Sequence, residues 1–199
     1  MPSLGALLPM LLAAPLAAQV AVPSGPPPAG IVERVLAVVD GRPLLLSDVR
    51  ALQRARGVSE EAALELLVDE SLMYDQASRT PQAAVTPEEE QGARAELALQ
   101  SPGLAAQVAE AALARLLRRQ LAILKYVDFR FRPQVRPSDE DLLRAYAELY
   151  QGREGAPAFE TVSEALRERV TREQLGERVE AWVRELRADA EVRHVGPPG

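Results

Sequence analysis

The sequence contains no cysteine and only one histidine, and these absences exclude several kinds of site. Without cysteine the chain has no disulfide, no thiolate metal ligand and no cysteine for lipid attachment. The one histidine, His194, lies beside Arg193 in a predicted strand, where a structural or solvent-facing role is the usual one. The sequence also has no phosphate-binding glycine loop, no dinucleotide glycine pattern and no G-x-S-x-G nucleophile motif. We therefore expect no cofactor, no metal and no catalytic residues.

Aromatic residues and positive charge are also scarce. Aromatics make up 4% of the chain and the formal net charge is −6, so nucleic acid is a poor candidate partner. Alanine, leucine, glutamate and arginine dominate, which favours helix, and 199 residues suffice for one domain with a core. Acidic residues are concentrated in 60–96 and basic residues in 115–136. We interpret these segments as two solvated faces that attract each other; the alternative is a docking patch.

Charged side chains are missing from residues 1–30, which divide into two parts. Residues 1–18 are rich in leucine and alanine and end in small residues, which is typical of a secretory signal peptide. The apolar run is too short for an anchor, since a spanning helix needs ~20 apolar residues. Residues 19–30 are rich in proline and predict an extended linker. We expect a periplasmic protein with a folded part at 31–195, a tail at 196–199 and no stable membrane span after cleavage.

The folded part is expected to begin with a β-hairpin. Two apolar segments, 32–39 and 42–46, flank Asp40-Gly41, and this dipeptide favours a type I′ turn. Pro43 has no N–H to donate, so the second arm must be short or lie at a sheet edge. A further strand is predicted at 191–195, and its backbone groups need partners. The two ends of the folded part should therefore meet in one small sheet.

The remaining segments predict helices, which makes the fold mainly α with a small β-sheet. The expected N-caps are Ser47, Ser59, Thr86 and Ser138. Gly57 should end the first helix, and Gly176 in the last one suggests close packing. The predicted helices cover, in chain order, residues 47–56, 60–79, 87–101, 104–128, 139–150 and 159 to beyond 186.

In their order and spacing, five of these segments resemble the SurA-type periplasmic chaperone and isomerase family. The opening segment, 34–49, reads RVLAVVDGRPLLLSDV and is similar to the family's first strands and helix. The other matching segments are 64–73, 85–89, 137–146 and 190–194, so the resemblance covers roughly 31–195. It implies a helical chaperone domain of the SurA N-terminal or trigger-factor-like peptide-binding class, acting on unfolded outer-membrane or secreted proteins.

One departure from the family bears on catalysis. Members often carry one or two parvulin isomerase domains of ~90 residues, a small domain size, between the helix matching 139–150 and the last helix. Here only the short loop 151–157 joins these helices. A parvulin-type site also uses paired histidines, whereas this chain has one histidine in total. We therefore expect that the protein lacks peptidyl-prolyl isomerase activity and is not an enzyme.

Nearly all the aromatic residues form one candidate peptide-binding set. They either fill the core or line an apolar groove for clients, because aromatic rings bury much area at low entropic cost. The set is Tyr126, Phe129, Phe131, Tyr146, Tyr150, Phe159 and Trp182. If residues 129–132 were extended, two rings and two guanidinium groups would lie on opposite sides.

Two functional hypotheses follow. The first is a periplasmic holdase that binds unfolded exported or outer-membrane proteins without ATP, since no nucleotide motif is present. The alternative is a structural or interaction protein that docks to a fixed cell-envelope partner through its long, charged last helix. An exposed apolar groove would favour the holdase, and a single stereospecific partner would favour the alternative.

Overall fold

The computed structural model describes residues 33–195, so the predicted signal peptide, linker and tail lie outside the described residues. Within this part the chain is mainly helical with one small antiparallel sheet, as predicted. The elements are β1 (Val35–Val39), β2 (Arg42–Leu45), α2 (Leu46–Arg56), α3 (Glu60–Ser78), η2 (Pro81–Ala83), α4 (Pro87–Gln100), α5 (Pro102–Gln107), α6 (Glu110–Arg130), η3 (Arg132–Gln134), α7 (Asp139–Tyr150), α8 (Phe159–Asp189) and β3 (Val192–His194). No helix in this described part is long and apolar enough to cross a membrane.

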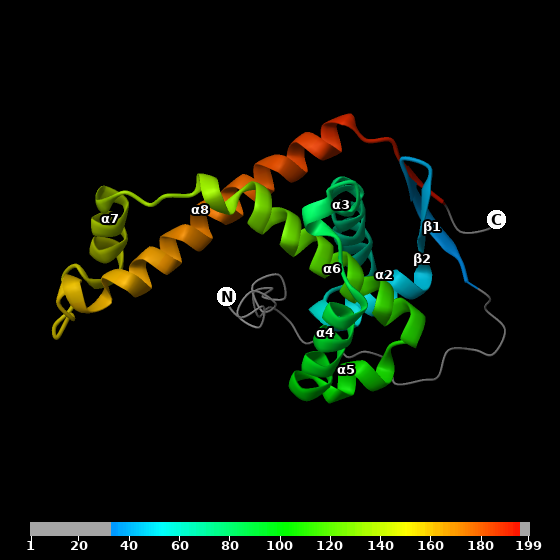
Figure 1. Ribbon diagram of the computed structural model, residues 1–199, viewed down its shortest axis with the longest axis horizontal. Helices are drawn as coiled ribbons and strands as arrows, with labels where there is room; N and C mark the ends of the chain where they lie inside the picture. Colours follow the sequence, from blue (N-terminus) through cyan, green and yellow to red (C-terminus); the bar gives the residue numbers. More distant parts are fainter. Residues whose placement is uncertain (1–32, 196–199) are drawn as a thin grey trace.

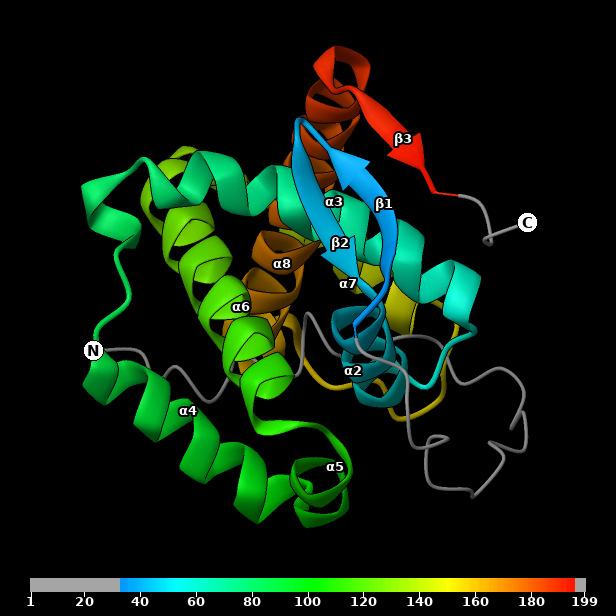
Figure 2. The same cartoon turned by 90° about the vertical axis from the view of Figure 1, so that its right-hand side faces the viewer.

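The sheet joins the two ends of the folded part, which confirms the prediction (Figures 1 and 2). Its strand order is β2-β1-β3, and both pairs are antiparallel. The hairpin turn has positive φ at both central residues, 47° at Asp40 and 78° at Gly41, as a type I′ turn requires. The turn also holds the returning chain, because the Glu191 N–H donates to Asp40 Oδ1 at 2.9 Å. Pro43 lies on β2, an edge strand.

Three of the four predicted helix caps are confirmed. The Ser59 side chain accepts a hydrogen bond from the Ala62 N–H, and Thr86 and Ser138 each form a full capping box. Gly57 ends α2 in the left-handed conformation, with φ of 66°. These signals were readable because each cap bonds to a residue only three or four positions away.

The predicted cap of α2 is wrong. The helix begins at Leu46, so Ser47 is its second residue and not its cap. The carboxylate of Glu33 instead accepts hydrogen bonds from the Ser47 N–H at 3.0 Å and from the Ser47 hydroxyl at 2.6 Å. An anionic group is well suited to a helix N-terminus, and these hydrogen bonds lower the pKa of Glu33. The hairpin makes this contact possible, since it brings the start of β1 beside the end of β2.

The predicted helix over 104–128 is in fact two helices. The break falls at Val108, whose backbone is extended and whose side chain is buried in the core. The carbonyl of Gln107, freed from helical bonding by the break, accepts a hydrogen bond from Arg54 Nη1 at 2.8 Å. Burial of one valine and this contact with α2 therefore turn the chain where local sequence favours a continuous helix.

The last helix, α8, is continuous, as predicted, but the role expected of its glycine is wrong. A Cβ atom built at Gly176 would meet no atom within 4 Å, so no neighbouring element packs closely there.

The apolar side chains form three clusters. The largest joins the sheet, α2, α3, α4 and α6, and a second joins α6 to the C-terminal half of α8. The third is formed by α7 and the N-terminal part of α8, and includes the buried Leu142 and Leu166. In Figure 1 this last unit projects from the rest of the molecule. We call α7 together with residues 159–170 the arm, and the remaining elements the body.

Candidate functional site

The candidate aromatic residues fall into two groups and one isolated ring. Tyr126, Phe131 and Trp182 form the inner group, where α8 crosses the end of α6. The rings of Tyr126 and Trp182 stack with centroids 5.0 Å apart, and Phe131 lies 5.4 Å from Trp182. All three side chains are buried. In this conformation they belong to the core and fasten α8 to the body.

Phe129 and Phe131 do not share one side of an extended segment. Helix α6 continues to Arg130, so the two rings lie on different faces: Phe131 is buried and Phe129 is 51% exposed. The guanidinium of Arg130 lies 5.5 Å from the centre of the Phe131 ring, within the range of a cation–π contact. The alternation in the sequence therefore does not produce two opposite surfaces.

The outer group of rings lies on the arm. Tyr146, Tyr150 and Phe159 are each half-buried and pack together, with the Tyr146 ring 5.2 Å from Tyr150 and 5.6 Å from Phe159. The Tyr146 hydroxyl donates to the carbonyl of Pro157 at 2.7 Å, which ties the connecting loop to α7. Leu143 on the same helix is 55% exposed. The arm thus carries apolar surface that is partly open to solvent.

The acidic and basic segments do attract each other, as predicted. Acidic residues of α3 and α4 pair with basic residues of α6: Glu89 lies 2.8 Å from Lys125, and Glu90 pairs with Arg118. The hydrogen bond from Lys125 lowers the pKa of Glu89, and the hydrogen bond from Arg118 lowers that of Glu90. These pairs hold α4 against α6, so both segments act within the fold.

A buried polar cluster was not anticipated from the sequence. The Glu70 side chain, on α3, accepts hydrogen bonds from Arg56 and Arg119 at 3.3 Å and from Gln120 at 2.5 Å. Glu70 is 4% exposed and Arg119 is 9% exposed. The sequence does contain an indication of this cluster. Glu70 lies at helical spacing from Ala63 and Leu67, which places its carboxylate on the apolar face of the helix.

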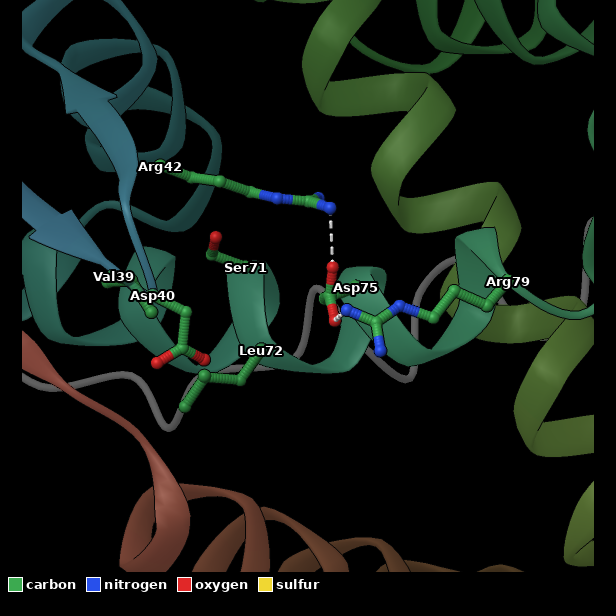
Figure 3. Close-up of a pocket in the computed structure, with 7 residues that line it drawn as sticks. All are labelled: Val39, Asp40, Arg42, Ser71, Leu72, Asp75 and Arg79. Carbon is green, nitrogen blue, oxygen red and sulfur yellow. Dashed lines mark ion pairs between the residues drawn. The ribbon is translucent and has the colours of Figure 1, made fainter.

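A depression of about 290 Å³ lies between the hairpin and α3 (Figure 3). Asp75 forms ion pairs with Arg42 at 2.5 Å and with Arg79 at 2.6 Å. The lining residues are Val39, Asp40, Arg42, Ser71, Leu72, Asp75 and Arg79. We assign the ion pairs a structural role, which is to anchor the hairpin to α3.

Four large apolar side chains in the described part are exposed, and they are the best candidates for contact with other molecules. They are Leu99 (85% exposed), Leu143 (55%), Phe129 (51%) and Val195 (39%). Only Phe129 was among the residues predicted from the sequence. Leucines are common in helices whether buried or exposed, so the sequence alone gave no reason to select Leu99 or Leu143.

Comparison with known proteins shows a similarity of fold. No protein-family model matches the chain, and the search of curated proteins found no match. The fold is similar to a solved structure from work on PEB4 and Cj1289, described as two structurally related SurA-like chaperones of Campylobacter jejuni. The two structures superpose with a TM-score of 0.54 at 12% identity, over 82% of this chain and 99% of the other. The chain therefore shares its fold with a SurA-like chaperone.

Proposed function

We propose that the protein is a periplasmic chaperone that holds unfolded exported or outer-membrane proteins, without isomerase activity. The observation that carries this proposal is the fold, which is similar to that of a SurA-like chaperone over 82% of the chain. The opening segment predicted as a signal peptide supports export, although it lies outside the described residues.

Binding is proposed to be weak and independent of ATP. Exposed or half-exposed apolar side chains such as Leu143, Tyr146 and Phe129 would contact apolar stretches of a client. Aromatic side chains suit this role because they bury a large area with few rotatable bonds. Release would follow when the client folds or passes to another protein, since only its unfolded form exposes such stretches.

Catalysis is not part of the proposal. The segment between α7 and α8 is a short loop, whereas isomerisation of a prolyl bond crosses a barrier of ~20 kcal/mol and needs a shaped, desolvated pocket. A direct assay with a proline-containing peptide tests this point. Acceleration above the uncatalysed rate, lost when the protein is unfolded, would overturn it.

The test of the holdase proposal is suppression of aggregation. An unfolded outer-membrane β-barrel protein is diluted from denaturant into the purified protein lacking residues 1–18, and light scattering is followed. We expect saturable suppression at micromolar concentrations, with no binding to a folded control protein. Absence of suppression would contradict the proposal, and a fixed envelope partner, recovered as a single crosslinked species, would replace it.

Variants of the arm examine the contribution of its apolar surface. Leu143→Gln removes an exposed apolar side chain from α7 and should raise the concentration needed for half-suppression. The matched control is Glu148→Gln, which changes an exposed residue of the same helix and should leave this concentration unchanged. Equal behaviour of both variants would remove Leu143 from the proposed contact.

A further inference from the structure

We propose that the corner formed by α4 and α5, residues 97–109, docks short uncharged apolar segments of unfolded chains, with Leu99 as its anchor. This inference rests on the proposed chaperone function and assigns a contact surface to it. None of the residues that the sequence selected as candidate binding residues lies in this corner.

The corner is the longest uncharged stretch of the described chain. Charged residues make up 26% of the protein, yet residues 97–109 contain none. The stretch is bounded by Glu96 on one side and Glu110 on the other. When an apolar segment covers an uncharged surface, no charged side chain has to lose its water. That loss is the main cost of burying charged groups.

Much of this uncharged stretch faces solvent. Leu99 is 85% exposed, the highest value among the large apolar side chains of the described part. Scattered exposed leucines are ordinary, but here the neighbouring exposed side chains are small or uncharged as well. The exposed neighbours are Ala98, Gln100, Pro102, Gly103, Ala106, Gln107 and Ala109. Figure 2 shows α4 and α5 together at one edge of the body, away from the sheet.

Contacts on the inner side attach both ends of the corner to the body. Leu97 and Val108, which bracket it, are both buried in the largest cluster. The carbonyl of Gln107 accepts a hydrogen bond from Arg54, and Arg94 of α4 pairs with Glu110, the first residue of α6, at 3.0 Å. Both ends of the stretch are therefore attached to the body, which lowers the entropy lost when a segment binds.

The size and charge of the corner favour a segment of an unfolded chain over a folded partner. A stable interface between folded proteins uses about 20–30 residues on each side. The stretch 97–109 supplies fewer residues than that, and part of it is buried, so by itself it does not form a stable interface with a second copy of this chain. A short apolar segment needs less area, and several weak contacts of this kind along a client add up through their high effective concentration.

Two variants that add the same charge to the same helix test the proposal. Leu99→Glu places a carboxylate in the corner, and Gln91→Glu places one at an exposed position of α4 outside it. With an unfolded β-barrel protein as the probe, Leu99→Glu should raise the concentration for half-suppression of aggregation about fivefold or more. The Gln91→Glu variant should match the unmodified protein.

Crosslinking supplies a second measurement that does not depend on aggregation. Because the chain has no cysteine, Leu99→Cys and Gln91→Cys each carry one site for a photoactivated crosslinker. We expect the client to crosslink at position 99 and not at 91. If the unmodified protein suppresses aggregation but Leu99→Glu does so equally and no client crosslinks at 99, the corner is excluded while the chaperone function stands. If the unmodified protein neither suppresses aggregation nor crosslinks to client, both proposals fail.

Discussion

At the scale of single residues, Glu70 is a buried carboxylate that pairs with two guanidinium groups. One carboxylate compensates two guanidinium groups inside the body, and Arg56 Nε and Arg119 Nη2 are buried without a hydrogen-bond partner. Uncompensated buried charge is far more costly than the loss of an ion pair at the surface, because water cannot replace the missing partner. Glu70 therefore joins α2, α3 and α6 through electrostatics as well as packing.

We predict that Glu70→Gln lowers the free energy of unfolding by about 3–5 kcal/mol, the usual effect of breaking a buried ion pair from one side. The control is Glu90→Gln, which removes the partner of the exposed Arg118 and should cost about 1 kcal/mol or less. Urea denaturation followed by circular dichroism measures both. If both variants lowered the free energy of unfolding by a similar amount, the guanidinium groups of Arg56 and Arg119 would not depend on Glu70 for compensation of their charge.

At the scale of helices and strands, the sequence predicted what is locally determined. The turn at Asp40 and the caps at Ser59 and Thr86 were correct because each depends on residues at most four positions apart. The cap of α2 comes from Glu33, 14 residues before Ser47, and only the folded hairpin brings them together. The break at Val108 depends likewise on burial in a core formed by distant helices. Tertiary contacts outweighed helix propensity there.

Gly176 yields a prediction for α8. It lies in a helix interior with open space around its Cα, so Gly176→Ala should stabilise the protein by about 0.5–1 kcal/mol through helix propensity. The contrasting variant is Gly57→Ala: its φ of 66° is unfavourable for alanine, and the change should destabilise by about 1 kcal/mol or more. Thermal unfolding of both proteins gives the sign of each effect. A destabilising Gly176→Ala would indicate that the added methyl group meets a neighbouring atom, against the open space that the structure shows there.

At the scale of the whole molecule, the sequence correctly predicted that the two ends of the folded part meet in one sheet, but it did not separate the arm from the body. The aromatic residues looked like one set, yet α8 distributes them between two cores, with Trp182 in the body and Phe159 in the arm. Helical periodicity gives the buried face of α8 along its whole length without telling which partner covers each half. The division between Val170 and Leu175 is a property of the tertiary fold.

The arm is expected to open independently of the body, because α7 packs mainly on α8 and its cluster contains few buried residues. Leu142→Ala removes most of a side chain that is 1% exposed at the centre of that cluster. We expect this variant to lose the protection of backbone amides from hydrogen exchange over residues 139–170. The free energy of unfolding of the body should change by less than about 1 kcal/mol. Leu67→Ala, at a fully buried position of the body, should instead lower global stability by about 2–5 kcal/mol. Hydrogen exchange read by mass spectrometry distinguishes the two patterns. If Leu142→Ala weakened arm and body equally in one transition, the arm would be an integral part of a single cooperative unit.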